Sequence, residues 1–198
     1  FLPSPLRSRG KGVAWAGVLA SAGYDVGPSV SGATTNPVRP SGRLRLGGFG
    51  GAEGLRRYVA EEGIAAVIDA THPFAAQMSR HAAEVMVPVL RLERRAWDSE
   101  ANWTVVRSVD EAAAALPAGA RALVTIGRKE VAAFFARRDI SGVARMIEPV
   151  AAPENWKVLV GRPPFTVAAE RALMTREAIP HLVSKNAGGA QTFAKIIA

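Results

Sequence analysis

Short runs of apolar and β-branched residues alternate along this chain with alanine-rich stretches of helical periodicity. The run at 64–68 is apolar throughout, as expected for a strand buried on both faces of a sheet. Gly63 precedes this run and closes a helix in which Leu55, Tyr58 and Val59 share one face. Strands and helices that alternate in this order form parallel sheets, so the pattern predicts an α/β fold.

The alternation continues to the end of the chain and is interrupted by a polar segment at 94–102, which has the character of a linker. This linker divides the chain into an N-terminal lobe, residues 1–96, and a C-terminal lobe, residues 97–198. We expect two Rossmann-like, doubly wound lobes with mainly parallel sheets and a cleft between them. Further strands are expected at 89–92, 103–106, 122–126, 143–147, 158–160 and 181–184, and further helices at 75–87, 109–116, 131–137 and from 192.

The composition excludes several classes of protein. The 198 residues include no Cys, which excludes disulfide scaffolds, thiol nucleophiles and Cys-ligated zinc or iron–sulfur sites. His72, His81 and His181 lack the spacing of a helical metal site, so no metal is predicted. Because no apolar run reaches the roughly 18 residues of a membrane span, and the proline-broken start does not resemble a signal peptide, we expect a cytoplasmic protein.

The formal net charge of +8 indicates an anionic partner. The 25 Lys and Arg residues are scattered, however, and form neither a basic tract nor an aromatic–basic RNA-binding pattern. This distribution favours a small polyanion, such as a nucleotide cofactor or a polycarboxylate, over nucleic acid.

Ligands of open parallel sheets bind beyond the carboxyl ends of the strands. A glycine pair there, as at Gly188-Gly189, lets backbone N–H groups approach a phosphate at the start of a helix, and Arg128, Arg162 and Lys185 can supply positive charge. Each loop by itself is also consistent with a tight turn or a solvated arginine. Together they predict a ligand-binding cleft. The four strand ends with groups suited to anions are Asp69–Ala75, Gly127-Arg128, Gly161–Phe165 and Lys185–Gly189.

His72 follows a strand and precedes a proline. Its imidazole can donate a proton or a hydrogen bond to a phosphate, and a packed residue that orders the loop is an equally good interpretation.

The sequence motifs of other enzyme classes are absent. Trp15 occupies the place of the third glycine in a dinucleotide-binding loop, and no G-x-S-x-G nucleophile turn is present.

These strand ends, with Asn36-Pro37-Val38, Gly47–Gly51 and Lys195, resemble the precorrin-6A reductase family of cobalamin biosynthesis. The resemblance follows the family's order from about residue 36 to the end of the chain. It implies an NADPH-dependent oxidoreductase that reduces a double bond of precorrin-6A, a tetrapyrrole, to give precorrin-6B. Hydride passes from the nicotinamide to a ring carbon, and a proton completes the reduction. We expect a monomer with a small-molecule substrate and no nucleic-acid or membrane partner.

The same resemblance assigns roles to individual residues. His72 and Lys185 are, with solvent, the candidates for supplying the closing proton. Contacts to substrate carboxylates are assigned to Arg162, Lys185 and Asn186. Contacts to the cofactor are assigned to Thr71, His72, Gly127, Arg128, Gly188 and Gly189.

The chain departs from the family pattern near its start. Residues 1–15 lack a Gly-Gly-Thr type loop, and Ala33 stands where the family tends to carry an arginine able to meet the 2′-phosphate of NADPH. NADH therefore stays open as the alternative nicotinamide. The alternative function is a basic α/β module that binds nucleic acid or another polyanion without reductase activity.

Overall fold

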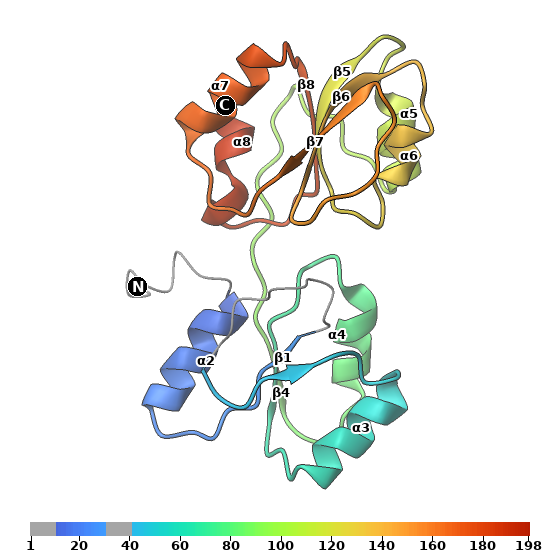
Figure 1. The fold of residues 1–198 in the computed structure, drawn as a ribbon. Helices are drawn as coiled ribbons and strands as arrows, with labels where there is room; N and C mark the ends of the chain where they lie inside the picture. The colour runs from blue at the N-terminus through green and yellow to red at the C-terminus, as the bar shows by residue number, and fades with distance from the viewer. Residues whose placement is uncertain (1–10, 31–40) are drawn as a thin grey trace. The chain divides into compact units, whose positions relative to one another are not determined.

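The structure is a computed structural model that describes residues 11–30 and 41–198 (Figure 1). Ala33 and the Asn36–Val38 motif lie outside the described residues. The chain divides into two compact units, one ending at Arg95 and the other beginning at Ala96, whereas the sequence places the boundary one residue later. Helices and parallel strands alternate in both units, which confirms the α/β class.

The described part of the first unit consists of helices and two pairs of parallel strands. Leu55 and Val59 pack with Ala82 and Val85 in its apolar core, which confirms the helical face expected from the sequence. The strand expected at 64–68 begins three residues later. The helices are α2 (Lys11–Ser21), α3 (Ala52–Glu61) and α4 (Ala76–Ala83); the strand pairs are β1 (Ser29–Val30) with β2 (Arg45–Leu46), and β3 (Val67–Asp69) with β4 (Val89–Arg91).

The second unit contains one parallel sheet of four strands in the order β7-β6-β5-β8. The chain leaves the central strand β5 in one direction through β6 and β7, and then returns to place β8 on the other side of β5. The strand order therefore reverses between β5 and β8. The strands are β5 (Arg121–Thr125), β6 (Ser141–Met146), β7 (Trp156–Val160) and β8 (His181–Ser184).

Helices cover both faces of this sheet, as Figure 1 shows, with α5 (Val109–Ala115) and α6 (Ala132–Phe135) on one face. The other face carries α7 (Val167–Arg176) and α8 (Ala194–Ile197). Alternate side chains of β5 pack on opposite faces of the sheet: Val124 packs with Phe134 of α6, and Leu123 packs with Leu173 of α7. Burial on both faces explains why this strand is apolar without interruption.

Some element predictions need correction. Residues 103–106 form no strand, and Val105 is 75% exposed, because no described strand pairs with this segment. The helix expected from about 192 is present as the four-residue α8, which begins two residues later, at Ala194, after the 3₁₀ turn η1 (Ala190–Thr192). The sequence reading passed over α7, although Thr166 marks its start by accepting a hydrogen bond from Ala169 N at 3.2 Å.

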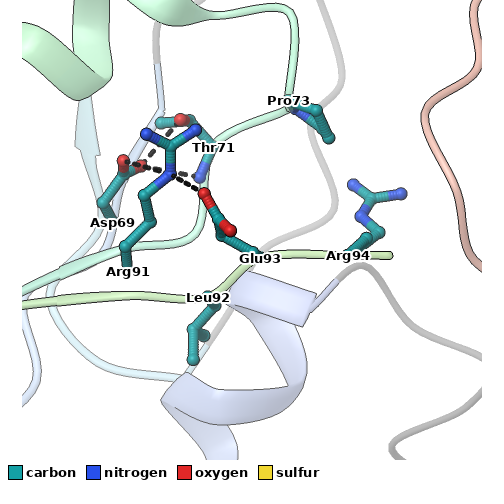
Figure 2. Close-up of a pocket in the computed structure, with 7 residues that line it drawn as sticks. All are labelled: Asp69, Thr71, Pro73, Arg91, Leu92, Glu93 and Arg94. Atoms are coloured by element: carbon teal, nitrogen blue, oxygen red, sulfur yellow. Dashed lines mark hydrogen bonds and ion pairs between the residues drawn. The ribbon is translucent and has the colours of Figure 1, made fainter. Parts of the chain in front are cut away.

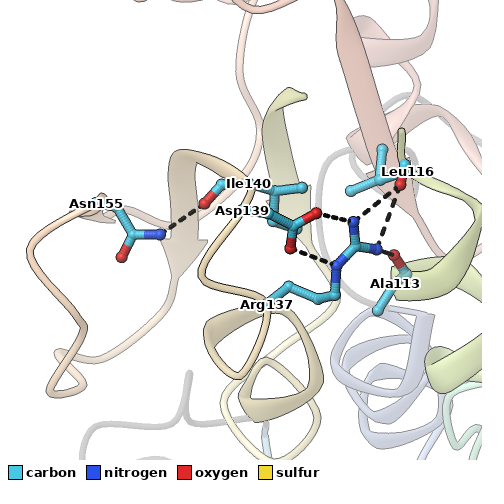
Figure 3. Close-up of polar contacts among 6 residues, drawn as sticks. All are labelled: Ala113, Leu116, Arg137, Asp139, Ile140 and Asn155. Atoms are coloured by element: carbon cyan, nitrogen blue, oxygen red, sulfur yellow. Dashed lines mark hydrogen bonds and ion pairs between the residues drawn. The ribbon is translucent and has the colours of Figure 1, made fainter. Parts of the chain in front are cut away.

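Arg137 joins the end of α5 to the segment before β6 (Figure 3). Its Nη1 donates to Ala113 O at 2.6 Å, and its Nε donates to Asp139 Oδ1 at 2.7 Å. Beside this pair, Asn155 Nδ2 donates to Ile140 O at 2.6 Å. The guanidinium thus satisfies a helix-end carbonyl at the amino edge of the sheet, so the charge of Arg137 stabilises the fold.

Candidate functional site

Three of the four predicted anion-binding loops lie at one edge of one sheet. Gly127-Arg128 follows β5, Gly161–Phe165 follows β7 and Lys185–Gly189 follows β8. Because these strands are parallel, their carboxyl ends share an edge, and the three loops lie along it. The fourth loop, Asp69–Ala75, follows β3 in the first unit.

The reversal of strand order between β5 and β8 makes a natural ligand site at this edge. Thr125 pairs with Ser184 in register, and Thr125 Oγ1 donates to Val183 O at 3.2 Å, which joins the two strand ends. Gly127 follows with φ of 103°, and a Cβ placed there would meet nothing within 4 Å. A glycine with a left-handed backbone and open space beside it allows a ligand to approach the main chain closely.

Gly188 and Gly189 give the loop after β8 a conformation that other residues avoid. Their φ angles are 64° and 79°, and Gly189 combines its φ with a ψ of 161°, a region that is essentially restricted to glycine. The short 3₁₀ turn η1 follows them and leads into the four-residue α8. The glycine pair therefore offers backbone N–H groups to a ligand without a long helix dipole behind them.

Asn186 ties this loop to the linker. Its Oδ1 accepts a hydrogen bond from Trp97 N at 2.7 Å, and its Nδ2 donates to Trp97 O at 2.8 Å. Trp97 Nε1 donates in turn to Gly189 O at 3.0 Å, and the Trp97 ring lies 5.5 Å from that of Phe193. The carboxamide assigned to the substrate is thus engaged with the backbone of Trp97, a residue that the sequence reading did not select.

The three predicted cations of this edge differ in their pairing. Arg128 Nη1 lies 3.5 Å from Glu148 Oε2, and Lys185 Nζ pairs with Glu130 Oε2. Arg162 is exposed and has no hydrogen bond or ion pair with a described residue. The charge of Arg162 is therefore the most available of the three to an anionic ligand.

In the first unit, Asp69 organises the loop after β3, as Figure 2 shows. The carboxylate is 6% exposed; its Oδ1 accepts from Thr71 N at 3.0 Å and from Thr71 Oγ1 at 2.7 Å, and Arg91 Nε lies 4.0 Å from Oδ2. Burial raises the pKa of Asp69, but hydrogen bonds from Ser79 and Thr71 and the charge of Arg91 outweigh it and hold the pKa below its usual value. Asp69, Thr71 and Arg91 line a pocket of about 130 Å³ that Arg94 also borders.

His72 takes part in the turn that follows. Its Nδ1 accepts a hydrogen bond from Phe74 N at 3.3 Å, and its carbonyl accepts from Ala75 N at 2.7 Å. An imidazole that accepts at Nδ1 carries its hydrogen on Nε2 when neutral. His72 is exposed, so it orders its own loop while its ring stays accessible.

Asp69 makes the free energy of unfolding of the first unit depend on pH. A carboxyl whose pKa is lowered by folding adds stability above its unfolded pKa, and that stability is lost as the pH falls through the folded pKa. We expect urea unfolding to show Asp69→Asn about 1 to 2 kcal/mol less stable than wild type at pH 7, because its charge-assisted hydrogen bonds are lost. The difference should shrink on titration below about pH 4. An equal difference at pH 7 and in acid would contradict this role.

The sequence reading missed acidic partners that lie at the same edge. Glu130 and Glu148 come shortly after β5 and β6, and they pair with Lys185 and Arg128. Their position beyond strand ends is the signal in the sequence that marks both carboxylates. Within the described ranges, no cluster of three or more His, Asp or Glu could hold a metal ion, and no helix is long and apolar enough to cross a membrane.

Comparison with known proteins gives a consistent result. Residues 10–198 match the family model described as precorrin-6x reductase CbiJ/CobK. The chain is 40% identical over 190 residues to the precorrin-6A reductase of Rhodobacter capsulatus, covering 91% of this chain and 76% of that protein. It is also 40% identical over 201 residues to the precorrin-6A reductase of Rhodococcus erythropolis, covering 96% and 81%. A solved structure of CobK precorrin-6A reductase superposes with a TM-score of 0.86 and 38% identity, covering 93% of this chain and 78% of that chain.

Proposed function

This chain belongs to the precorrin-6x reductase CbiJ/CobK family, and from that premise we propose how its residues reduce precorrin-6A with NADPH as the hydride donor. It is an oxidoreductase of cobalamin biosynthesis. Family membership favours this activity over that of a polyanion-binding module without catalysis. The observation that carries the residue assignments is the carboxyl edge of the second unit, where Gly127, Gly188 and Gly189 have positive φ angles beside the β5–β8 reversal.

The glycines at this edge fit a dinucleotide. Gly127 has open space where a side chain would begin, and Gly188 and Gly189 leave backbone N–H groups unshielded by a Cβ. Arg128 adds a cation that Glu148 holds in place. These four residues would hold the phosphates of the cofactor, and Thr71 and His72 remain the assignments made for the first unit.

When bound, NADPH supplies hydride to a carbon of the macrocycle. The protein's task is to orient the two ligands and to keep water from the reacting atoms. Arg162 and Lys185 would hold the acidic side chains of the tetrapyrrole, since Arg pairs with carboxylates through two parallel hydrogen bonds. Asn186 would act indirectly: it holds the backbone of Trp97, and the Trp97 indole in turn donates to the Gly189 carbonyl.

Besides solvent, we propose two side chains as sources of the closing proton. His72 is exposed and would present Nε2–H, because its Nδ1 accepts from Phe74 N. Lys185 is ion-paired with Glu130. A proton taken from Lys185 would be returned from solvent, since its side chain is 22% exposed.

The direct test is anaerobic incubation of the purified protein with precorrin-6A and, separately, NADPH or NADH. We expect oxidation of NADPH to proceed in step with a change in the absorbance of the macrocycle, at equal molar amounts. Faster turnover with NADH would overturn the choice of cofactor, and failure with both nicotinamides would overturn the proposed activity.

Arg162→Ala should raise the KM for precorrin-6A about tenfold, because the variant loses an unpaired cation that contacts a substrate carboxylate. Steady-state kinetics with each ligand varied separately would check this. Arg128→Ala is the matched control, since it removes the same charge at the same edge and should affect the KM for NADPH instead. An unchanged KM for precorrin-6A in Arg162→Ala would contradict the assignment.

A further inference from the structure

Three ionisable side chains are buried together beneath the carboxyl edge of the second unit. Arg145 belongs to β6, Glu170 to the first turn of α7 and Lys195 to α8. The side chains of Arg145 and Glu170 are 7% and 2% exposed, and Lys195 is 7% exposed. Charged residues are rarely buried to this degree unless each has a partner.

The charges of this cluster do not balance. Arg145 Nη1 donates to Glu170 Oε2 at 2.7 Å, so these two residues form a closed pair. Lys195 has no hydrogen bond or ion pair with any described residue. The cluster therefore carries one positive charge in excess, and burial of an unpaired ammonium is strongly unfavourable.

The surroundings of Lys195 bring its pKa closer to neutral pH. Burial lowers the pKa of Lys195 to about 8, with a further lowering from the charge of Arg145 and an opposing contribution from Glu170. The packed helix α7 also presents Arg171, whose Nη2 donates to Ile197 O at 3.4 Å. The ammonium form is thus held without an ion pair to any described residue, and Glu170 offsets its burial only in part.

The cluster is adjacent to the proposed ligand edge. The Arg145 guanidinium lies 4.2 Å from the centre of the Phe165 ring, and Phe165 belongs to the loop that carries Arg162. Lys195 follows Gly188-Gly189 by one short turn of chain. The unpaired ammonium is thus held among segments whose loops carry the predicted ligand contacts.

We propose that Lys195 binds an oxyanion of a ligand at this edge, and that this anion supplies the negative charge that the buried cluster lacks. A dinucleotide phosphate and a tetrapyrrole carboxylate share the required chemistry, and the identification of these two sources rests on the proposed function. Proteins commonly keep a destabilising group where a ligand needs it, so the cost of the buried ammonium is itself consistent with a binding role.

The test compares two substitutions that remove one positive charge each. Lys195→Met removes the buried ammonium and keeps a chain of similar length. Lys157→Met is the control, since the Lys157 side chain is 62% exposed, pairs with Glu177 Oε1 at 2.7 Å and is the second residue of β7, near the opposite edge of the sheet. Thermal unfolding of the full chain is followed at pH 7 alone, with inorganic pyrophosphate and with a polycarboxylate porphyrin.

Without added anion, Lys195→Met should melt above the wild type and Lys157→Met at or below it. At least one anion should raise the melting temperature of the wild type and of Lys157→Met, while Lys195→Met needs about tenfold more of it for the same rise. A response confined to pyrophosphate identifies a cofactor phosphate, and one confined to the porphyrin identifies a substrate carboxylate. The proposal is overturned if neither anion stabilises the wild type, or if Lys195→Met responds as the wild type does. Absence of precorrin-6A reduction with a persisting difference between the variants would refute the proposed function and leave this inference standing.

Discussion

Replacement of Gly142 by alanine is expected to destabilise the second unit by about 3 to 5 kcal/mol. Gly142 has φ of 147° in strand β6 and is paired with Ala122 of β5. A Cβ at this position would lie 2.0 Å from Ala122 O and 2.8 Å from Ala122 N. Both colliding atoms are backbone atoms of the central strand, so relief requires the two strands to separate and their hydrogen bonds to break.

Gly119→Ala separates the cost of the backbone angle from that of the collision. Gly119 has φ of 78°, but its Cβ would meet nothing within 4 Å. We expect this variant to lose about 1 to 2 kcal/mol, from backbone strain alone. Denaturant unfolding followed by circular dichroism would compare the two. Equal losses in both variants would show that close contact between β5 and β6 does not depend on Gly142.

Gly189→Ala should lower kcat/KM for the reductase reaction about 100-fold, or about 2.7 kcal/mol in transition-state stabilisation. The φ of 79° and ψ of 161° at Gly189 are open to glycine and costly for alanine, so the substituted loop is expected to move. Movement would displace the Gly189 carbonyl from Trp97 Nε1 and the loop's N–H groups from the cofactor. Steady-state kinetics would measure the loss, and tryptophan fluorescence would report the change at Trp97.

Gly188→Asn is the matched control in the same loop. Its φ of 64° lies in the left-handed region that asparagine tolerates better than other side chains. We expect its kcat/KM to stay within about fivefold of the wild type and its Trp97 fluorescence to be unchanged. If Gly189→Ala retained wild-type kinetics, the loop after β8 would not be part of the cofactor site.

Much of the fold could be predicted because its signals are local. The apolar run around Leu123 and Val124 indicates a strand buried on both faces, and the structure packs helices against both of its faces. Ser108 and Glu111 mark the start of α5, where Ser108 Oγ accepts from Glu111 N at 3.0 Å. The same local reasoning failed at 103–106, since a β-branched run becomes a strand only when another strand is available to pair with it.

The candidate site was predictable in position but not in its pairings. Glycines and cations after β5, β7 and β8 are visible in the sequence, and the parallel topology brings their loops to one edge. Nothing local, however, indicates that Glu130 reaches Lys185, which is 55 positions away, or that Asn186 engages Trp97 across 89 positions. These contacts depend on the arrangement of whole strands.

By itself the sequence determined the class of fold, the family and the segments proposed to carry the chemistry, because periodicity, turn residues and ordered motifs are properties of neighbouring positions. Tertiary structure alone decided which charges are neutralised. Arg162 and Lys195 are left without partners among the described residues, whereas Arg128, Arg145 and Lys185 are paired. The physical reason is that the electrostatic environment of a side chain depends on burial and on distances across space, and the spacing of residues along the chain contains neither.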